Sequence, residues 1–385
     1  MKTIFTLFIF ALTISITANA QWTPVADFPG PALDGAFSFT IGDKAYVGGG
    51  PGVELFYEYN SQTDTWKKLA NVGGGPRGWA FSFVIDGKAY VGGGDPTGSF
   101  QPVNDFWEYN PVTNTWTKKA DFGGGNRDGC FSFSYNGKGY VGGGFDGNNM
   151  LSDFWEYDPT ANTWTSKSGF PGSPVVFPSV FQISEKVYVG CGAGNFEYNT
   201  LYMFNGCTKT WTSKTNFSGY SRQAGIGFAV NGKGYIGLGM SGYTSSYKDI
   251  FEYNPDTDNW QLLANAQYPI DNSAWSTCFV IGNDVFIGTG ASLPALQFTN
   301  KFYKRTFLPT KVVEENNDGS MIISPNPADD LINISNFNSA HFEIFSIEGI
   351  KMLESNIYGN VDISTFPSGV YIIKSGNNFL KFMKI

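Results

Sequence analysis

A single tryptophan recurs along most of the chain at nearly constant spacing, and this repeat limits the possible folds more than any other feature. The intervals between successive copies are 44, 50, 48, 47 and 49 residues. The copies are Trp22, Trp66, Trp116, Trp164, Trp211 and Trp260. A glycine, usually the first of a pair, accompanies each repeat at Gly48, Gly92, Gly142, Gly190, Gly237 and Gly288. A period of this length predicts one small supersecondary unit per repeat, stacked against its neighbours.

Each repeat contains four short apolar or alternating runs separated by turn residues such as Asn136-Gly137-Lys138. This pattern predicts a four-stranded antiparallel meander. One small sheet cannot bury both of its faces, whereas a ring of such sheets buries them and protects the edges. Glycine allows the inner strands to crowd the axis, and the larger rings of the outer strands fill the space between sheets. The sequence therefore predicts an all-β propeller.

The sixth repeat, from Ala274 to Phe307, has only three predicted strands and no final tryptophan. The missing strand is available at the other end of the chain, where Gln21–Val25 contains Trp22. Pairing it with the sixth repeat would close a ring of six blades over residues 21–307.

The glycine pair followed by a spaced tyrosine and tryptophan resembles the kelch repeat, and the resemblance covers about residues 21–307. It implies a six-bladed kelch-type β-propeller. The fourth repeat departs most from the pattern, because Cys191 interrupts its glycines and Phe204 replaces the tyrosine.

The first twenty residues have the features of a secretory signal peptide. Lys2 precedes an apolar run, and Ala18-Asn19-Ala20 provides a small-x-small cleavage site. The run from Ile4 to Ile16 is shorter than the ~20 residues that cross a bilayer, so we expect cleavage after Ala20 rather than an anchor. We expect no membrane span after signal removal.

The kelch-like pattern ends at Phe307, and residues 308–320 form a polar stretch that we interpret as a linker. Residues 321–385 again alternate in short runs, which predicts a small immunoglobulin-like β-sandwich.

Three motifs of this last segment resemble the type A C-terminal sorting domain of the type IX secretion system: Pro325-Asn326-Pro327, the turn at 348–351, and Pro367–Tyr371. The resemblance implies the type IX machinery as a partner. It also implies passage through the periplasm to the medium or to the outer-membrane surface.

A net charge of −8 argues against nucleic acid as the partner. Three of the four arginines, Arg77, Arg127 and Arg222, lie fifteen residues before the first glycine of their blade. Converging guanidinium groups at the mouth of the ring suit an acidic sugar. Kelch repeats often carry a scaffold arginine there, and we favour that role over ligand binding. Asp95 and Asp146, in longer loops, complete the candidate ligand set.

Four glutamates also repeat, each one residue before an aromatic residue of the third strand. A pair of carboxylates can hydrolyse a glycosidic bond, but repetition in four blades favours a scaffold role. They are Glu58, Glu108, Glu156 and Glu252.

We expect neither a metal nor a cofactor. The only histidine, His341, lies outside the propeller, and the four cysteines do not match a zinc pattern. The cysteines are Cys130, Cys191, Cys207 and Cys278.

These observations favour a monomeric module that binds a glycan or a surface protein, and not an enzyme. The alternative is a sugar-modifying enzyme of the epimerase or mutarotase kind that needs no histidine or metal. A third interpretation is a structural surface component without a small ligand.

Overall fold

The computed structural model describes residues 21–264, 266–271, 273–307, 322–335, 341–346, 350–356, 359–375 and 378–385. These residues form strands and no helix, which confirms the expected all-β class. The chain divides into two compact units, Met1–Leu308 and Pro309–Ile385. The predicted signal peptide with Ala20, the linker at 308–320, and Glu348 and Gly349 of the sorting motif lie outside the described residues.

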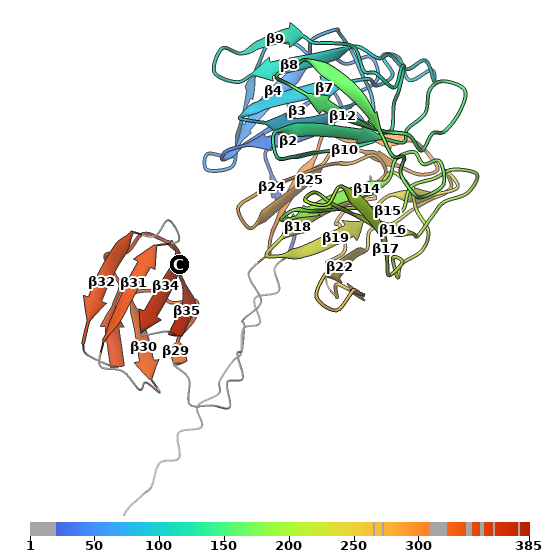
Figure 1. Ribbon diagram of the computed structural model, residues 1–385. Coiled ribbons are helices and arrows are strands. Elements are labelled where there is room, and N and C mark those ends of the chain that lie inside the picture. The colour runs from blue at the N-terminus through green and yellow to red at the C-terminus, as the bar shows by residue number, and fades with distance from the viewer. Residues whose placement is uncertain are drawn as a thin grey trace, which may run out of the picture. The chain divides into compact units, whose positions relative to one another are not determined.

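The first unit contains six four-stranded sheets, numbered here as blades 1 to 6, and the strands of each lie side by side in Figure 1. Blades 1 to 3 are β2 (Phe37–Ile41), β3 (Lys44–Gly48), β4 (Phe56–Asn60) and β5 (Thr65–Lys68); β6 (Phe81–Ile85), β7 (Lys88–Gly92), β8 (Phe106–Asn110) and β9 (Thr115–Lys118); and β10 (Phe131–Tyr135), β11 (Lys138–Gly142), β12 (Phe154–Asp158) and β13 (Thr163–Lys167).

Blades 4 to 6 follow the same antiparallel order. They are β14 (Ser179–Ile183), β15 (Lys186–Gly190), β16 (Leu201–Asn205) and β17 (Thr210–Lys214); β18 (Ile226–Val230), β19 (Lys233–Gly237), β22 (Ile250–Asn254) and β23 (Asn259–Leu262); and β24 (Thr277–Ile281), β25 (Asp284–Gly288), β28 (Phe302–Thr306) and β1 (Thr23–Val25). Two short ribbons extend loops of blades 5 and 6: β20 (Met240–Ser241) with β21 (Ser245–Ser246), and β26 (Ala291–Ser292) with β27 (Gln297–Phe298).

The N-terminal strand completes blade 6. β1 pairs antiparallel with β28, so that Thr23 lies opposite Lys304 and Pro24 opposite Tyr303. The proline is tolerated because β1 is the edge strand of its sheet and has a neighbour on one side only.

A repeated latch holds neighbouring blades together. In blade 2, Asn114 adopts a left-handed turn conformation, and its side-chain oxygen accepts hydrogen bonds from the Tyr109 hydroxyl and the Ala70 backbone N–H, both at 3.0 Å. The Trp116 indole donates to the Ala70 carbonyl. Tyrosine and tryptophan therefore tie the outer strands to the chain that leaves the preceding blade.

The second glycine of a pair is required where the chain passes the next blade. Gly93 has φ +61°, and a Cβ atom there would overlap the Arg127 carbonyl oxygen. Aromatic side chains such as Phe81 and Phe106 fill the space between the glycine-containing strands and the adjacent blade.

The second unit contains two sheets with one common apolar cluster, and the cluster includes Ile332, Ile344 and Phe382. The three-stranded sheet is β29 (Ile322–Ser324), β30 (Leu331–Ser335) and β33 (Gly359–Asp362); the four-stranded sheet is β32 (Lys351–Ser355), β31 (Phe342–Ser346), β34 (Gly369–Ser375) and β35 (Asn378–Lys384).

Candidate functional site

The site lies on the face of the propeller that carries two kinds of loop. One kind joins the second and third strands of a blade, and the other leads from one blade to the next. Strand direction alternates in an antiparallel sheet, so both kinds emerge at the same edge. We call this surface the mouth face.

Six residues, one from each blade-to-blade loop, form a closed circle of backbone hydrogen bonds. The N–H of each donates to the carbonyl oxygen of the preceding one over 2.7–3.2 Å, and Gly35 closes the circle by donating to Trp275. All six have left-handed backbone conformations, with φ from 51° to 63°. The members of this axial circle are Gly35, Trp79, Gly129, Phe177, Ala224 and Trp275.

Large and small side chains alternate around the axial circle. Trp79, Phe177 and Trp275, here called the aromatic triad, have ring centroids 6.0–6.2 Å apart. They border a cavity of about 150 Å³ together with the small residues between them. Gly35 and Gly129 occupy the equivalent positions in blades 1 and 3. The backbone conformation at this position therefore does not require an aromatic residue.

A bulky residue in the left-handed region costs roughly 1–3 kcal/mol, and such strain persists mainly where function requires it. Three further residues, in the loops between second and third strands, combine a left-handed backbone with an exposed side chain. Phe100, Tyr243 and Leu296 have φ of 59°, 55° and 48°, and each is about half exposed or more. The Tyr243 ring lies 6.0 Å from that of Trp275. Exposed aromatic groups of this kind mark an interaction surface.

Two carboxylates lie beside the axial circle without a partner. Asp34 and Asp128 directly precede Gly35 and Gly129, are 8% and 3% exposed, and make no side-chain hydrogen bond or ion pair with another described residue. Burial raises the pKa of Asp34 to about 6. Burial and the charge of Asp95 raise the pKa of Asp128 to about 7.

Tyr243 lies near Asp128 across the mouth. Burial, followed by the negative charges of Glu197 and Asp128, raises the pKa of the Tyr243 hydroxyl. A carboxyl group with a pKa of about 7 and a tyrosine hydroxyl therefore interact electrostatically at the mouth face.

Asp128→Asn is expected to raise the free energy of unfolding at pH 8 by about 1–3 kcal/mol. The carboxyl group has a pKa of about 7 in the folded chain and near 3.8 when unfolded, so folding takes up a proton between these values. Stability of the natural protein should therefore fall as pH rises from about 4 to about 7, and stay reduced above it. Urea denaturation over this range should show a flatter profile for the variant, whereas parallel profiles would contradict a buried, unpaired carboxylate.

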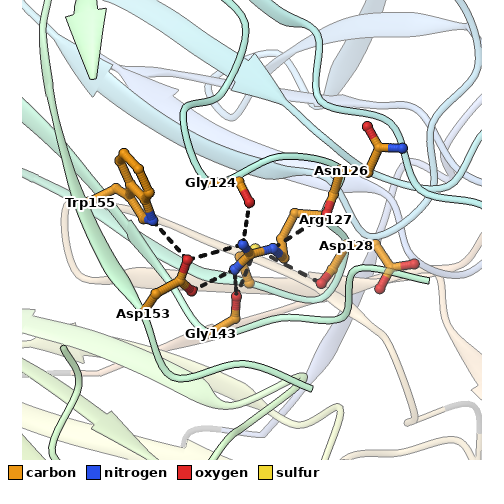
Figure 2. A network of polar contacts seen from close by, with 8 residues as sticks. Gly124, Asn126, Arg127, Asp128, Gly143, Asp153 and Trp155 are labelled. Carbon is orange, nitrogen blue, oxygen red and sulfur yellow. Dashed lines mark hydrogen bonds and ion pairs between the residues drawn. The ribbon is translucent and has the colours of Figure 1, made fainter. Parts of the chain in front are cut away.

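The three predicted arginines lie in the blade-to-blade loops, and each forms an ion pair with an aspartate. Arg127, only 1% exposed, donates to both oxygens of Asp153 at 2.7 and 3.1 Å and to the carbonyls of Gly124 and Gly143 (Figure 2). Figure 2 also shows the Asp128 side chain pointing away from this network. Arg77 and Arg222 are likewise buried and paired, with Asp105 and Asp249.

We therefore favour a scaffold role for the arginines: each ties a blade-to-blade loop to the loop between the second and third strands. A ligand contact for them stays a prediction. No two of the three are brought together, since each has a separate carboxylate in its own blade.

Asp95 and Asp146 organise their own loops. Asp95 is buried and accepts backbone hydrogen bonds from Thr97, Gly98 and Gln101 at 2.9–3.1 Å. Asp146 accepts from the backbone of Asn148 and Asn149, and these bonds lower its pKa. Ligand binding by either aspartate also stays a prediction.

The repeated glutamates each accept a hydrogen bond from a tyrosine hydroxyl of the neighbouring strand. The four pairs are Glu58 with Tyr46, Glu108 with Tyr90, Glu156 with Tyr140, and Glu252 with Tyr235, at 2.7–3.1 Å.

Within the described ranges, no cluster of three or more potential metal ligands occurs, and the four cysteines are free thiols. The same residues include no helix long and apolar enough to cross a membrane.

Comparisons with known proteins agree with this architecture. Residues 8–189 match the model of the KLHDC2/KLHL20/DRC7 Kelch-repeats domain, and residues 323–384 match the Secretion system C-terminal sorting domain. A solved structure titled "Structure of YjhT" is similar at a TM-score of 0.63 and 20% sequence identity, over 74% of this chain and 95% of that one. No curated protein matches the chain.

The fold is thus that of a kelch-type propeller. The kelch repeats and the type IX sorting domain that the sequence predicted are both confirmed, and the sorting domain indicates export to the cell surface or secretion.

Proposed function

We propose that the exported propeller is a binding module that holds a saccharide at the centre of its mouth face. The observation that carries this proposal is the aromatic triad, which occupies strained backbone positions where glycine would be less costly. Aromatic rings offer flat apolar faces against which the C–H face of a sugar ring can stack. A cavity of about 150 Å³ lies beside the triad.

Polar groups suited to sugar hydroxyls surround the triad. Asp34 and Asp128 provide acceptors that bind no other described residue, and the Tyr243 hydroxyl can donate or accept. The indole N–H groups of Trp79 and Trp275 are buried and have no hydrogen-bond partner among the described residues. Few well-placed polar groups around an apolar surface are typical of small-molecule sites.

Replacing both Trp79 and Trp275 by glycine is expected to weaken saccharide binding about 10- to 100-fold, because two stacking faces are lost. Glycine accepts the left-handed backbone, as Gly35 and Gly129 do, so the ring should stay folded. A glycan array identifies the ligand, and calorimetry then compares the two proteins.

Leu262→Ala is the matched control, because Leu262 is 56% exposed but lies on the outer strand β23. Unchanged affinity in the glycine variant would place the saccharide elsewhere. Failure of the natural protein to bind any glycan, together with capture of a surface protein through this face, would replace the proposal by protein binding.

A second function, sugar modification, is favoured by one observation: Asp128, with a pKa of about 7, lies near Tyr243. General acid–base catalysis is most effective when the pKa of the catalytic group is near the working pH. If the site catalyses anomer exchange, adding the protein to a freshly dissolved reducing sugar should accelerate the approach to anomeric equilibrium, followed by proton NMR. Asp128→Asn should abolish that acceleration. A rate equal to that of buffer alone excludes this activity.

A further inference from the structure

Every basic residue in the described loops of the mouth face already has an acidic partner. Three arginines and three lysines occur in these loops. The ion pairs are Arg77–Asp105, Arg127–Asp153, Arg222–Asp249, Lys119–Glu108, Lys248–Asp271 and Lys301–Asp27. The mouth face therefore has no unpaired cation among these residues to attract an anionic ligand.

Acidic residues, in contrast, are in excess on the same loops. Those without an ion pair to a described residue are Asp34, Glu54, Asp95, Asp128, Asp146 and Glu197. Glu54, Asp95, Asp146 and Glu197 accept hydrogen bonds from neighbouring loop groups. The side chains of Asp34 and Asp128, the two beside the axial circle, accept no hydrogen bond from another described residue.

Burying a carboxylate without a partner is costly, and the unfavourable burial of Asp34 and Asp128 is evident in their raised pKa values. The groups that face Asp128 do not relieve the cost. Asp95 adds a like charge, Tyr243 is neutral at physiological pH, and the neighbouring guanidinium of Arg127 is bound to Asp153. A positive charge from outside the chain would neutralise this position.

The aromatic triad favours the same charge. The faces of tryptophan and phenylalanine rings carry negative potential and attract ammonium groups, with tryptophan the most effective. Two independent features of the mouth, the excess of carboxylates and the cluster of electron-rich aromatic rings at the axis, thus favour a cation. Both features disfavour the acidic sugar that the three arginines would suit.

We propose that the ligand is a cationic saccharide, one with free amino groups, whose ammonium groups bind at Asp128 and at Asp34, next to the axial circle that carries the aromatic triad. This inference rests on the proposed saccharide function and deepens it. An acidic saccharide would meet repulsion from six carboxylates without counter-charge.

The test compares two oligosaccharides of equal length built from glucosamine, one with free amino groups and one fully N-acetylated, at pH near 7 and low salt. We expect the natural protein to prefer the free-amine oligomer by about tenfold or more, with the preference reduced at high salt. The double variant Asp34→Asn, Asp128→Asn should lose the preference, so that the ratio of the two affinities falls to about one. Asp121→Asn, which alters an exposed aspartate paired with Lys118, should keep the preference.

Other outcomes distinguish an error in the preference for a cation from an error in the proposal of saccharide binding. Equal binding of both oligomers, or stronger binding of a polyuronic acid, overturns the cation inference and leaves saccharide binding intact. No binding of any of the three, or of other glycans, overturns the proposed function itself. Retention of the free-amine preference in the double variant would contradict the role of Asp34 and Asp128.

Discussion

Asp153→Ala is expected to lower the free energy of unfolding by about 3–5 kcal/mol, because it leaves the Arg127 guanidinium buried without its counter-charge. Arg127 is almost fully buried, and among the described residues Asp153 is the carboxylate that it contacts directly, through two hydrogen bonds. The hydrogen bonds to the carbonyl oxygens of Gly124, Asn126 and Gly143 remain, but neutral acceptors compensate a buried cation poorly. Chemical denaturation of the purified propeller measures the change.

The matched control is Asp121→Ala, which removes the partner of Lys118 in a pair whose two side chains are about half exposed. That variant should lose no more than about 1 kcal/mol, as exposed pairs do. If Asp153→Ala were as mild as the control, the scaffold role would be wrong, and Arg127 would return as a candidate for ligand contact.

Removal of residues 309–385 is expected to abolish export while the propeller itself stays folded. The two units are separate in their internal contacts, and the second matches the sorting domain. The truncated protein should therefore collect in the periplasm, as immunoblots of cell fractions and medium would detect. The reciprocal fusion of residues 309–385 to an unrelated periplasmic protein should direct that protein outward. Normal release of the truncated propeller would refute the sorting role.

The propeller could be predicted because its determinants repeat. Blades 1, 2, 3 and 5 use the tyrosine of the third strand and the tryptophan of the fourth for the same latch, so the pattern recurs at a regular period. Blade 4 lacks two of the side chains that form this latch. Phe204 lacks the hydroxyl that would bind the turn residue, and the turn carries Lys209 in place of aspartate or asparagine, with its ammonium over the Tyr140 ring.

The mouth could not be predicted in the same way, because its residues do not repeat. Asp34 and Asp128 have Gly78 and Val176 at equivalent positions, and their raised pKa values result from burial that exists only once the ring is closed. The three arginines do repeat, but each of them forms an ion pair with an aspartate of the following loop. One feature of the sequence could have indicated the mouth. Large and small residues alternate just before the first strand of each blade, with tryptophan or phenylalanine at positions where two other blades have glycine.

Completion of blade 6 by β1 also determines when this protein can finish folding. Thr23 pairs with Lys304, so the first and last strands of the propeller must meet over a sequence separation of 281 residues. Blades 1 to 5 can form in the order of synthesis, but the sixth sheet has no outer strand until the start of the chain returns to it. The propeller can therefore close only after β28 has been synthesised and β1 is available to pair with it.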